Sequence, residues 1–262
     1  VYSYASNIYD MFPKWWGRKD IPDHSKAFNL VGNLLLDCGI QFAGLFLGEG
    51  RTFPDDVATS EKGAFPRLSP KEFPYIILPS TSHLTDKNLD ILKRYVESGG
   101  KLIILGDCGE WDEKHNKRTT NVLDSLYEKG KIIWQKALPL DKPDLLFEQV
   151  MDMLKKAGWS PTIVEFNLKP LTHKVLRQSK DGLILHILNK EFEEGKGFRR
   201  LENLKISLKL PKGFRPSRKI FCYSPDWESS PREINAVLKG DDLILELPPF
   251  DVWLIAEIRK EK

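Results

Sequence analysis

Cys108 stands in a glycine-flanked turn, Gly106 to Glu110, directly after a short apolar run. Such a turn between a strand and a helix exposes a thiol, and the N-terminus of the helix lowers the pKa of that thiol. Here Glu110 replaces the second turn glycine, and a polar stretch follows instead of a helix. No histidine occurs between His115 and His173 to act as the base. We therefore favour a structural role for this strand-end cysteine and expect no catalytic residue in this chain. If the chain does have a catalytic residue, Cys108 is the candidate.

Acidic side chains gather in the same loop. Glycosidases use two carboxylates that lie about 5–10 Å apart, and a loop with several acids can satisfy that spacing. Solvated loops are also commonly acidic, so we favour a solvated loop over a catalytic pair. The acids concerned are Asp107, Glu110, Asp112 and Glu113.

Tryptophans accompany these acids. Trp15 and Trp16 occur in an early loop, and Trp111 follows Cys108. Ligands of open parallel sheets bind outside the carboxyl ends of the strands, where these loops are expected to meet. An indole ring offers a flat apolar face and a polar N–H, which suits the apolar face of a sugar. The candidate ligand-binding residues are therefore Trp15, Trp16, Trp111, Asp107 and Glu110, with packing of the tryptophans beneath their own loops as the alternative.

The stretch from Tyr75 to Glu113 positions most of these side chains. Its two apolar runs, Tyr75–Leu78 and Lys101–Leu105, do not alternate with polar residues, which is typical of strands in a parallel sheet. Between them apolar residues recur at helical spacing, with Asp86 as the expected N-cap and Gly99-Gly100 as the stop. The stretch predicts a βαβ unit with a right-handed crossover.

The remaining residues up to 158 follow the same alternation of elements. After residue 158 the helical spacing disappears, and about eight short apolar runs are separated by turn signals such as Lys239-Gly240-Asp241-Asp242. We predict an α/β domain over 1–158 and an antiparallel β-sandwich domain over 159–262. In the first domain we expect strands at 1–5, 40–47 and 131–135, and helices at 25–38, 121–128 and 144–157.

Composition excludes several classes of protein. The net charge of +3 is small and the charges are mixed, so a nucleic-acid partner is not expected. No apolar run approaches 18 residues, so a membrane span is not expected either. Three dispersed cysteines favour a reducing, cytoplasmic location and show no metal-ligand spacing, and no cofactor is indicated. The 29% of charged residues weakly suggests a thermophilic source.

The first residues, Val1 to Ala5, already read as a core strand and lack an initiator methionine. We therefore expect the chain to be part of a longer polypeptide with a missing upstream domain.

Two sets of motifs carry a resemblance to a known family. The run Tyr75–Ser80, then Leu84-Thr85, then Tyr95–Gly106 resembles the glutamine-amidotransferase-like domain of large glycoside hydrolases, the β-galactosidase trimerisation type. The motifs Leu185–Asn189 and Ser224-Pro225-Asp226 resemble the C-terminal β domain of the same enzymes. The resemblance implies a flavodoxin-like or class I amidotransferase-like parallel sheet followed by an all-β sandwich.

The same resemblance implies a function. In that family the catalytic carboxylates lie on an upstream (β/α)8 barrel, so this chain is expected to be a non-catalytic C-terminal part of a glycoside hydrolase. It would form homo-oligomer contacts and line a site for an oligosaccharide. Two alternatives stay open, namely a free-standing amidotransferase-like hydrolase using Cys108 and a carbohydrate-binding or interaction protein.

Overall fold

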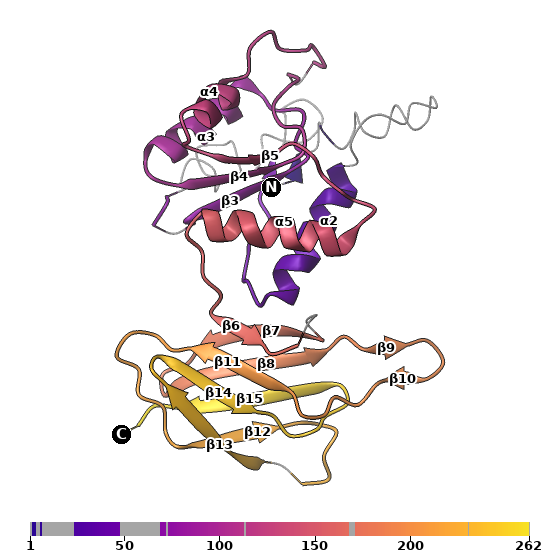
Figure 1. The fold of residues 1–262 in the computed structure, drawn as a ribbon, viewed down its shortest axis with the longest axis vertical. Helices are drawn as coiled ribbons and strands as arrows, with labels where there is room; N and C mark the ends of the chain where they lie inside the picture. The colour runs from indigo at the N-terminus through magenta and orange to yellow at the C-terminus, as the bar shows by residue number, and fades with distance from the viewer. Residues whose placement is uncertain are drawn as a thin grey trace. The chain divides into compact units, whose positions relative to one another are not determined.

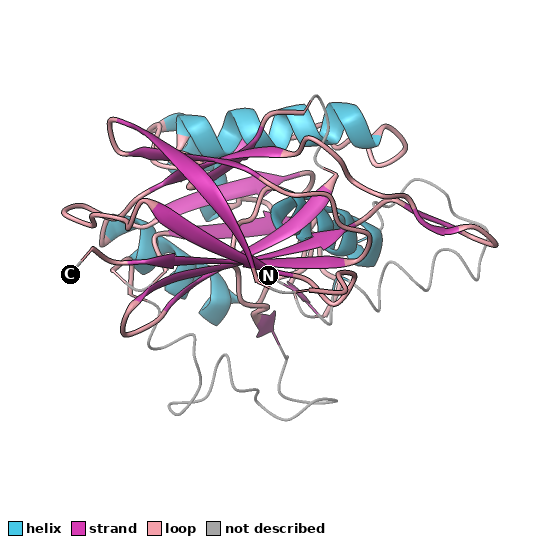
Figure 2. Cartoon of the chain, turned by 90° about the horizontal axis from the view of Figure 1, so that it is seen from below, coloured by secondary structure: helices cyan, strands magenta, loops and turns pink. Residues whose placement is uncertain are grey.

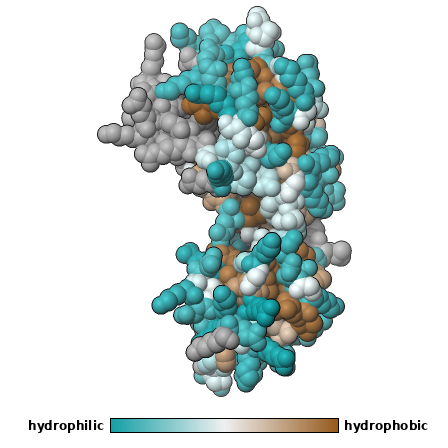
Figure 3. Space-filling model, turned by 90° about the vertical axis from the view of Figure 1, so that its left-hand side faces the viewer, coloured by the Kyte–Doolittle hydropathy of each residue, from teal (hydrophilic) through white to brown (hydrophobic). Residues whose placement is uncertain are grey.

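The computed structural model describes residues 2–3, 6, 24–47, 69–71, 73–112, 114–167, 171–229 and 231–261 (Figure 1). The chain separates into two compact units, each with its own apolar core. The first comprises Val1–Gly32 and Ala43–Trp159, and the second comprises Asn33–Phe42 and Ser160–Lys262. On the face drawn in Figure 3, hydrophilic side chains cover much of each unit, with smaller hydrophobic patches between them.

Three parallel strands, in the order β3-β4-β5, form the sheet at the centre of the first unit. A separate pair of short parallel strands, β1 and β2, does not join that sheet within the described residues. The strands are β1 (Tyr2–Ser3), β2 (Phe46–Leu47), β3 (Tyr75–Pro79), β4 (Lys101–Leu105) and β5 (Ile133–Gln135). The helices are α2 (His24–Asp37), α3 (Asp86–Glu97), α4 (Val122–Glu128) and α5 (Pro143–Lys156).

The βαβ unit predicted around α3 is present. Thr85, not Asp86, is the N-cap, and its hydroxyl accepts a hydrogen bond from the Asn88 N–H. Asp86 instead lies in the first turn, where its negative charge suits the helix dipole. At the other end of the helix, the Tyr95 ring packs so close to Gly100 that a Cβ there would collide with it. Glycine is therefore required at this position by packing as well as by the turn.

The flavodoxin-like or amidotransferase-like fold class is wrong. The described part of the first unit has a small three-stranded sheet in chain order, whereas a flavodoxin-like sheet has five strands in the order 2-1-3-4-5. Residues 40–47, expected as one strand of the main sheet, contribute only the two residues of β2, which pair with β1.

The second unit is one antiparallel sheet of eight strands in the order β6-β11-β14-β13-β12-β15-β8-β7 (Figures 1 and 2). The expected sandwich of two sheets is therefore also wrong, because these strands pair in one unbroken series. The strands are β6 (Ile163–Glu165), β7 (Thr172–Gln178), β8 (Gly182–Asn189), β11 (Lys205–Lys209), β12 (Lys219–Tyr223), β13 (Arg232–Lys239), β14 (Asp242–Glu246) and β15 (Trp253–Arg259). A small hairpin, β9 (Phe192–Glu193) and β10 (Gly197–Phe198), follows β8.

The eight-stranded sheet curls until its two edges nearly meet. Alternate residues of strands throughout the sheet point into one shared core, among them Leu185 of β8 and Ile206 of β11. At the edges, Glu165 of β6 forms an ion pair of 2.8 Å with Lys174 of β7. Both side chains are at most 2% exposed, and the Thr172 hydroxyl donates to the same carboxylate. The edge strands β6 and β7 are not paired by backbone hydrogen bonds in the described sheet, and this buried ion pair links them instead.

The segment 33–42 contacts β7 within the second unit. The Gln41 amide donates to the Leu176 carbonyl, and the Asp37 carboxylate lies 3.2 Å from His173 Nδ1. Lys190 Nζ lies 2.5 Å from the same carboxylate. Among the described helices, none is long and apolar enough to cross a membrane.

Candidate functional site

The loops that follow β3 and β4 meet at the carboxyl ends of these parallel strands. Backbone hydrogen bonds join them, from Gly109 N–H to the Thr81 carbonyl at 2.9 Å and from Trp111 N–H to the Ser82 carbonyl at 3.1 Å. The return bond runs from Leu84 N–H to the Trp111 carbonyl at 3.1 Å. The structure thus brings together the two described loops that were expected to meet at this edge.

The residue directly after β3 and the residue directly after β4 both have a positive φ, which turns the chain at the edge of the sheet. Gly106 ends β4 with φ of 78°, which glycine adopts without strain. Ser80 ends β3 with φ of 46°, which is uncommon for a residue with a Cβ. Its side chain is buried, and its hydroxyl has no hydrogen-bond partner among the described residues. Strain and an unsatisfied polar atom at one residue are features that concentrate at functional sites.

Two histidines form a hydrogen-bonded pair at the centre of the edge. His83 Nε2 lies 2.8 Å from His115 Nδ1, and His83 Nδ1 lies 2.9 Å from the Ser82 hydroxyl. The two rings are nearly coplanar, with planes 10° apart and centroids 5.0 Å apart, so the imidazoles lie end to end. Burial, and after it the neighbouring His115, lowers the pKa of His83 to about 3. His83 is therefore neutral at physiological pH, donating from one ring nitrogen and accepting at the other.

Trp111 lies against this histidine pair. Its indole is parallel to the His115 ring, with centroids 4.5 Å apart and planes 9° apart. The Lys117 ammonium lies 5.9 Å from the indole centroid. Trp111 as a whole residue is partly buried. Its indole thus packs against His115, and its role in contacting a ligand stays a prediction.

The loop from Trp111 to Arg118 is held by its own hydrogen bonds. The Asp112 carboxylate accepts from the N–H groups of Lys114 and Asn116 at 2.9 and 2.8 Å, and the Asn116 side chain donates to it as well. The Asn116 side chain, together with the backbone donors, holds the pKa of Asp112 below its usual value against the opposing effect of burial. The Arg118 guanidinium donates to the Leu84 carbonyl at 2.6 Å and pairs with Asp86. Asp112 therefore orders its loop.

A third histidine ties the N-terminal residues to the same edge. Buried His24 accepts from Ser3 N–H at Nε2, so its proton lies on Nδ1, which donates to the Pro79 carbonyl at 2.8 Å. The hydroxyls of Ser3 and Ser6 donate to the His83 carbonyl at 3.1 and 3.3 Å. These hydrogen bonds hold the backbone carbonyl of His83 in place. His24 was not singled out in the sequence, because nothing local relates it to residues nearly 60 positions away.

Cys108 is completely buried. Burial raises the pKa of its thiol, and the nearby carboxylates of Asp107 and Glu110 raise it further. A thiol in these surroundings stays protonated at neutral pH, which is the opposite of the environment that activates a nucleophile. Its backbone carbonyl accepts from the Asn121 side chain at 2.7 Å, which joins the turn to the N-cap of α4. The geometry favours the structural interpretation of Cys108.

The two candidate acids flank that cysteine and are both half-buried. Burial raises the pKa of Glu110, and the negative charge of Asp107 raises it further. Carboxyl oxygens in these positions can accept hydrogen bonds from the hydroxyls of a ligand. Trp15, Trp16 and Glu113 lie outside the described residues. Within the described residues, no group of three or more potential metal ligands occurs.

The fold of this chain is similar to parts of several solved glycoside hydrolases. No protein-family model matches the sequence, and no curated protein of similar sequence matches it. Among solved structures, the chain is similar to Gan42B, a GH42 β-galactosidase from G. stearothermophilus, with a TM-score of 0.55 at 11% identity over 92% of this chain and 37% of that one. The β-galactosidase from Bacillus circulans sp. alkalophilus gives 0.52 at 9% identity, over 91% and 38% of the two chains.

A second kind of enzyme gives a similar value. The α-L-fucosidase isoenzyme 2 from Paenibacillus thiaminolyticus has a TM-score of 0.56 at 13% identity, over 90% of this chain and 45% of that one. The chain thus spans less than half the length of each of these three structures. Identities this low establish a shared fold, and they leave the activity of this chain to be argued from its own residues.

Proposed function

We propose that this chain is the non-catalytic C-terminal part of a glycoside hydrolase of the β-galactosidase kind, whose catalytic carboxylates lie on a domain upstream. The observation that carries the proposal is the likeness to Gan42B, which includes nearly the whole of this chain and only 37% of the enzyme. The buried, protonated thiol of Cys108 supports the non-catalytic reading, since it argues against cysteine chemistry.

Within that enzyme, the edge formed by the loops after β3 and β4 lines the sugar site. Three properties support this role. Trp111 is only partly buried, the His115 imidazole lies parallel beside its indole, and the half-buried carboxyl groups of Asp107 and Glu110 belong to the same loop. Apolar surface beside hydrogen-bonding groups is the combination that a sugar ring requires.

The test is steady-state hydrolysis of a nitrophenyl β-galactoside by the full-length protein carrying Trp111→Ala. Loss of an aromatic contact of about 0.5–1.5 kcal/mol should weaken substrate binding roughly two- to tenfold. We expect KM to rise by this factor with little change in kcat, because Trp111 would contact the sugar without taking part in bond cleavage.

Trp111→Phe is the matched control, since it retains an aromatic face. Its KM should stay close to that of the wild-type protein. Unchanged kinetics in Trp111→Ala would contradict the sugar-lining role. Homo-oligomer formation is a separate part of the proposal, and light scattering of the full-length protein measures it. A monomer at micromolar concentration contradicts that part.

A further inference from the structure

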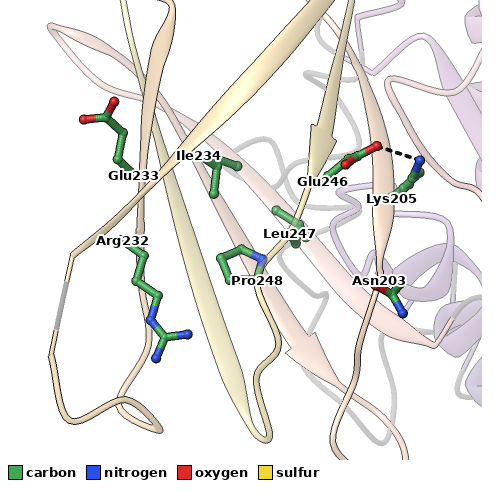
Figure 4. Close-up of a pocket in the computed structure, with 8 residues that line it drawn as sticks. All are labelled: Asn203, Lys205, Arg232, Glu233, Ile234, Glu246, Leu247 and Pro248. Atoms are coloured by element: carbon green, nitrogen blue, oxygen red, sulfur yellow. Dashed lines mark ion pairs between the residues drawn. The ribbon is translucent and has the colours of Figure 1, made fainter.

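The second unit contains a pocket of about 350 Å³ beside strand β13 (Figure 4). It arises from the way β13 changes partners. Residues 232–235 of β13 pair with β12, whereas residues 236–239 pair with β14. Pairing with β14 stops at Ala236 and Leu245, and the following run Glu246–Pro248 diverges from the first half of β13. The pocket is the gap left by this divergence.

The pocket has an apolar centre and a polar rim. Figure 4 shows Ile234, Leu247 and Pro248 between the strands, where they form the apolar surface. Arg232 lies on one side, and Asn203 lies on the other. A volume near 350 Å³ is at the lower end of the range for small-molecule sites, which suits one or two sugar rings.

The charges of the rim do not cancel. Both carboxylates are neutralised by lysines, since Glu246 lies 2.6 Å from Lys205 and Glu233 lies 3.1 Å from Lys219. Arg232 forms no ion pair or hydrogen bond with any described side chain. The pocket therefore presents one uncompensated guanidinium, whose N–H fork matches the two oxygens of a carboxylate.

That guanidinium is held in place. It lies over the indole of Trp227, 4.3 Å from the ring centroid, a cation–π arrangement. Trp227 itself is buried in the core of the unit, and its indole N–H donates to the Pro249 carbonyl at 2.8 Å. The same tryptophan thus contacts both Arg232 and the residue after Pro248, so the charged side and the apolar centre of the pocket are positioned before any ligand arrives.

We propose that this pocket binds a carboxylate-bearing sugar, a hexuronate, as a site separate from the edge of the parallel sheet. The carboxylate pairs with the Arg232 guanidinium, the apolar face of the pyranose lies on Ile234, Leu247 and Pro248, and the Asn203 amide hydrogen-bonds a ring hydroxyl. The choice of a sugar over another organic acid rests on the proposed function, whereas the choice of an anion rests on the charges of the pocket.

Titration calorimetry of the whole chain with D-galacturonate and D-galactose tests the proposal, because these sugars differ in the carboxylate at C6. We expect D-galacturonate to bind at least about tenfold more tightly than D-galactose, the factor that a charge-assisted bidentate contact supplies. Equal affinities, or binding of neither sugar, would overturn the proposal. N-acetylglycine binding as tightly as D-galacturonate would overturn the choice of a sugar.

The matched variants are Arg232→Gln and Arg218→Gln. Arg218 is also exposed on the second unit and does not line the pocket. Arg232→Gln should lose the preference for D-galacturonate at an unchanged melting temperature, and Arg218→Gln should keep it. Retained preference in Arg232→Gln contradicts the assignment. Because the readout is binding and not hydrolysis, its failure is distinguishable from failure of the sugar-lining role tested with Trp111.

Discussion

At the scale of single residues, the candidate site is defined by hydrogen bonds that a sequence does not display. Trp111, Asp107 and Glu110 could be selected from residue type and position after a strand, and the structure places all three in the loop after β4. The contacts between Ser6 and His83 join residues 77 positions apart, and no local pattern encodes them. The orphaned hydroxyl and left-handed backbone of Ser80 likewise depend on the folded environment.

Stability should depend on pH through His83. Its folded pKa of about 3 lies below the unfolded value near 6.5, so between these values only the unfolded chain binds the proton. The stabilising contribution is complete above pH 6.5 and is lost as pH falls toward 3, by at most about 1.4 kcal/mol per pH unit. Urea unfolding at pH 7.5, 6.5 and 5.5 measures it.

The comparison variant is His83→Gln, which keeps a hydrogen-bonding side chain but does not titrate. It should show a smaller fall in unfolding free energy between pH 6.5 and 5.5, a range above the usual titration of aspartate and glutamate. Identical pH dependence in the two proteins would show that His83 titrates normally.

Cys108 should react slowly with iodoacetamide at neutral pH. Burial removes it from solvent and raises its pKa, so little thiolate forms in the native protein. Peptide mapping after timed alkylation should find Cys108 modified much more slowly in native protein than in urea. Faster modification in the native protein would favour the alternative of a reactive nucleophile.

At the scale of elements, the spacing of apolar residues predicted well where helices and strands occur. It predicted poorly which strands are neighbours in a sheet. Apolar spacing predicted α3 and β4 nearly to the residue, and alternation predicted the strands of the second unit. Alternation specifies which face of a strand is buried, and it does not specify which strands are neighbours. The eight strands were therefore assigned to a sandwich, whereas their pairing forms one curled sheet.

The ion pair between Glu165 and Lys174 should matter for the closure of that sheet. Lys174→Met leaves a carboxylate buried without its partner, which should lower the unfolding free energy by about 3–5 kcal/mol. Adding Glu165→Gln should recover much of the loss, because the unpaired charge is removed. Lys196→Met is the control, since it breaks an exposed pair with Glu193 and should cost at most about 1 kcal/mol.

Chemical denaturation of the four proteins measures these energies. If Lys174→Met costs no more than Lys196→Met, the buried pair does not hold the two edge strands together.

At the scale of the whole molecule, the sequence indicated parallel β-structure first and antiparallel β-structure second, and both occur. The flavodoxin-like expectation failed because a βαβ unit is common to many parallel folds. The order of the other strands depends on long-range pairing, and in the part of the chain that the structure describes β1 and β2 pair with each other instead of extending the three-stranded sheet.

The central claim is that this chain functions as the C-terminal part of a larger glycoside hydrolase. The most direct test is the mass of the native polypeptide, measured by mass spectrometry after capture with an antibody against the second unit. We predict a polypeptide roughly two to three times heavier than the 30.2 kDa of this chain, since the chain spans 37% of Gan42B. Its additional peptides should come from an upstream (β/α)8 barrel, whereas a native mass near 30.2 kDa would contradict the account.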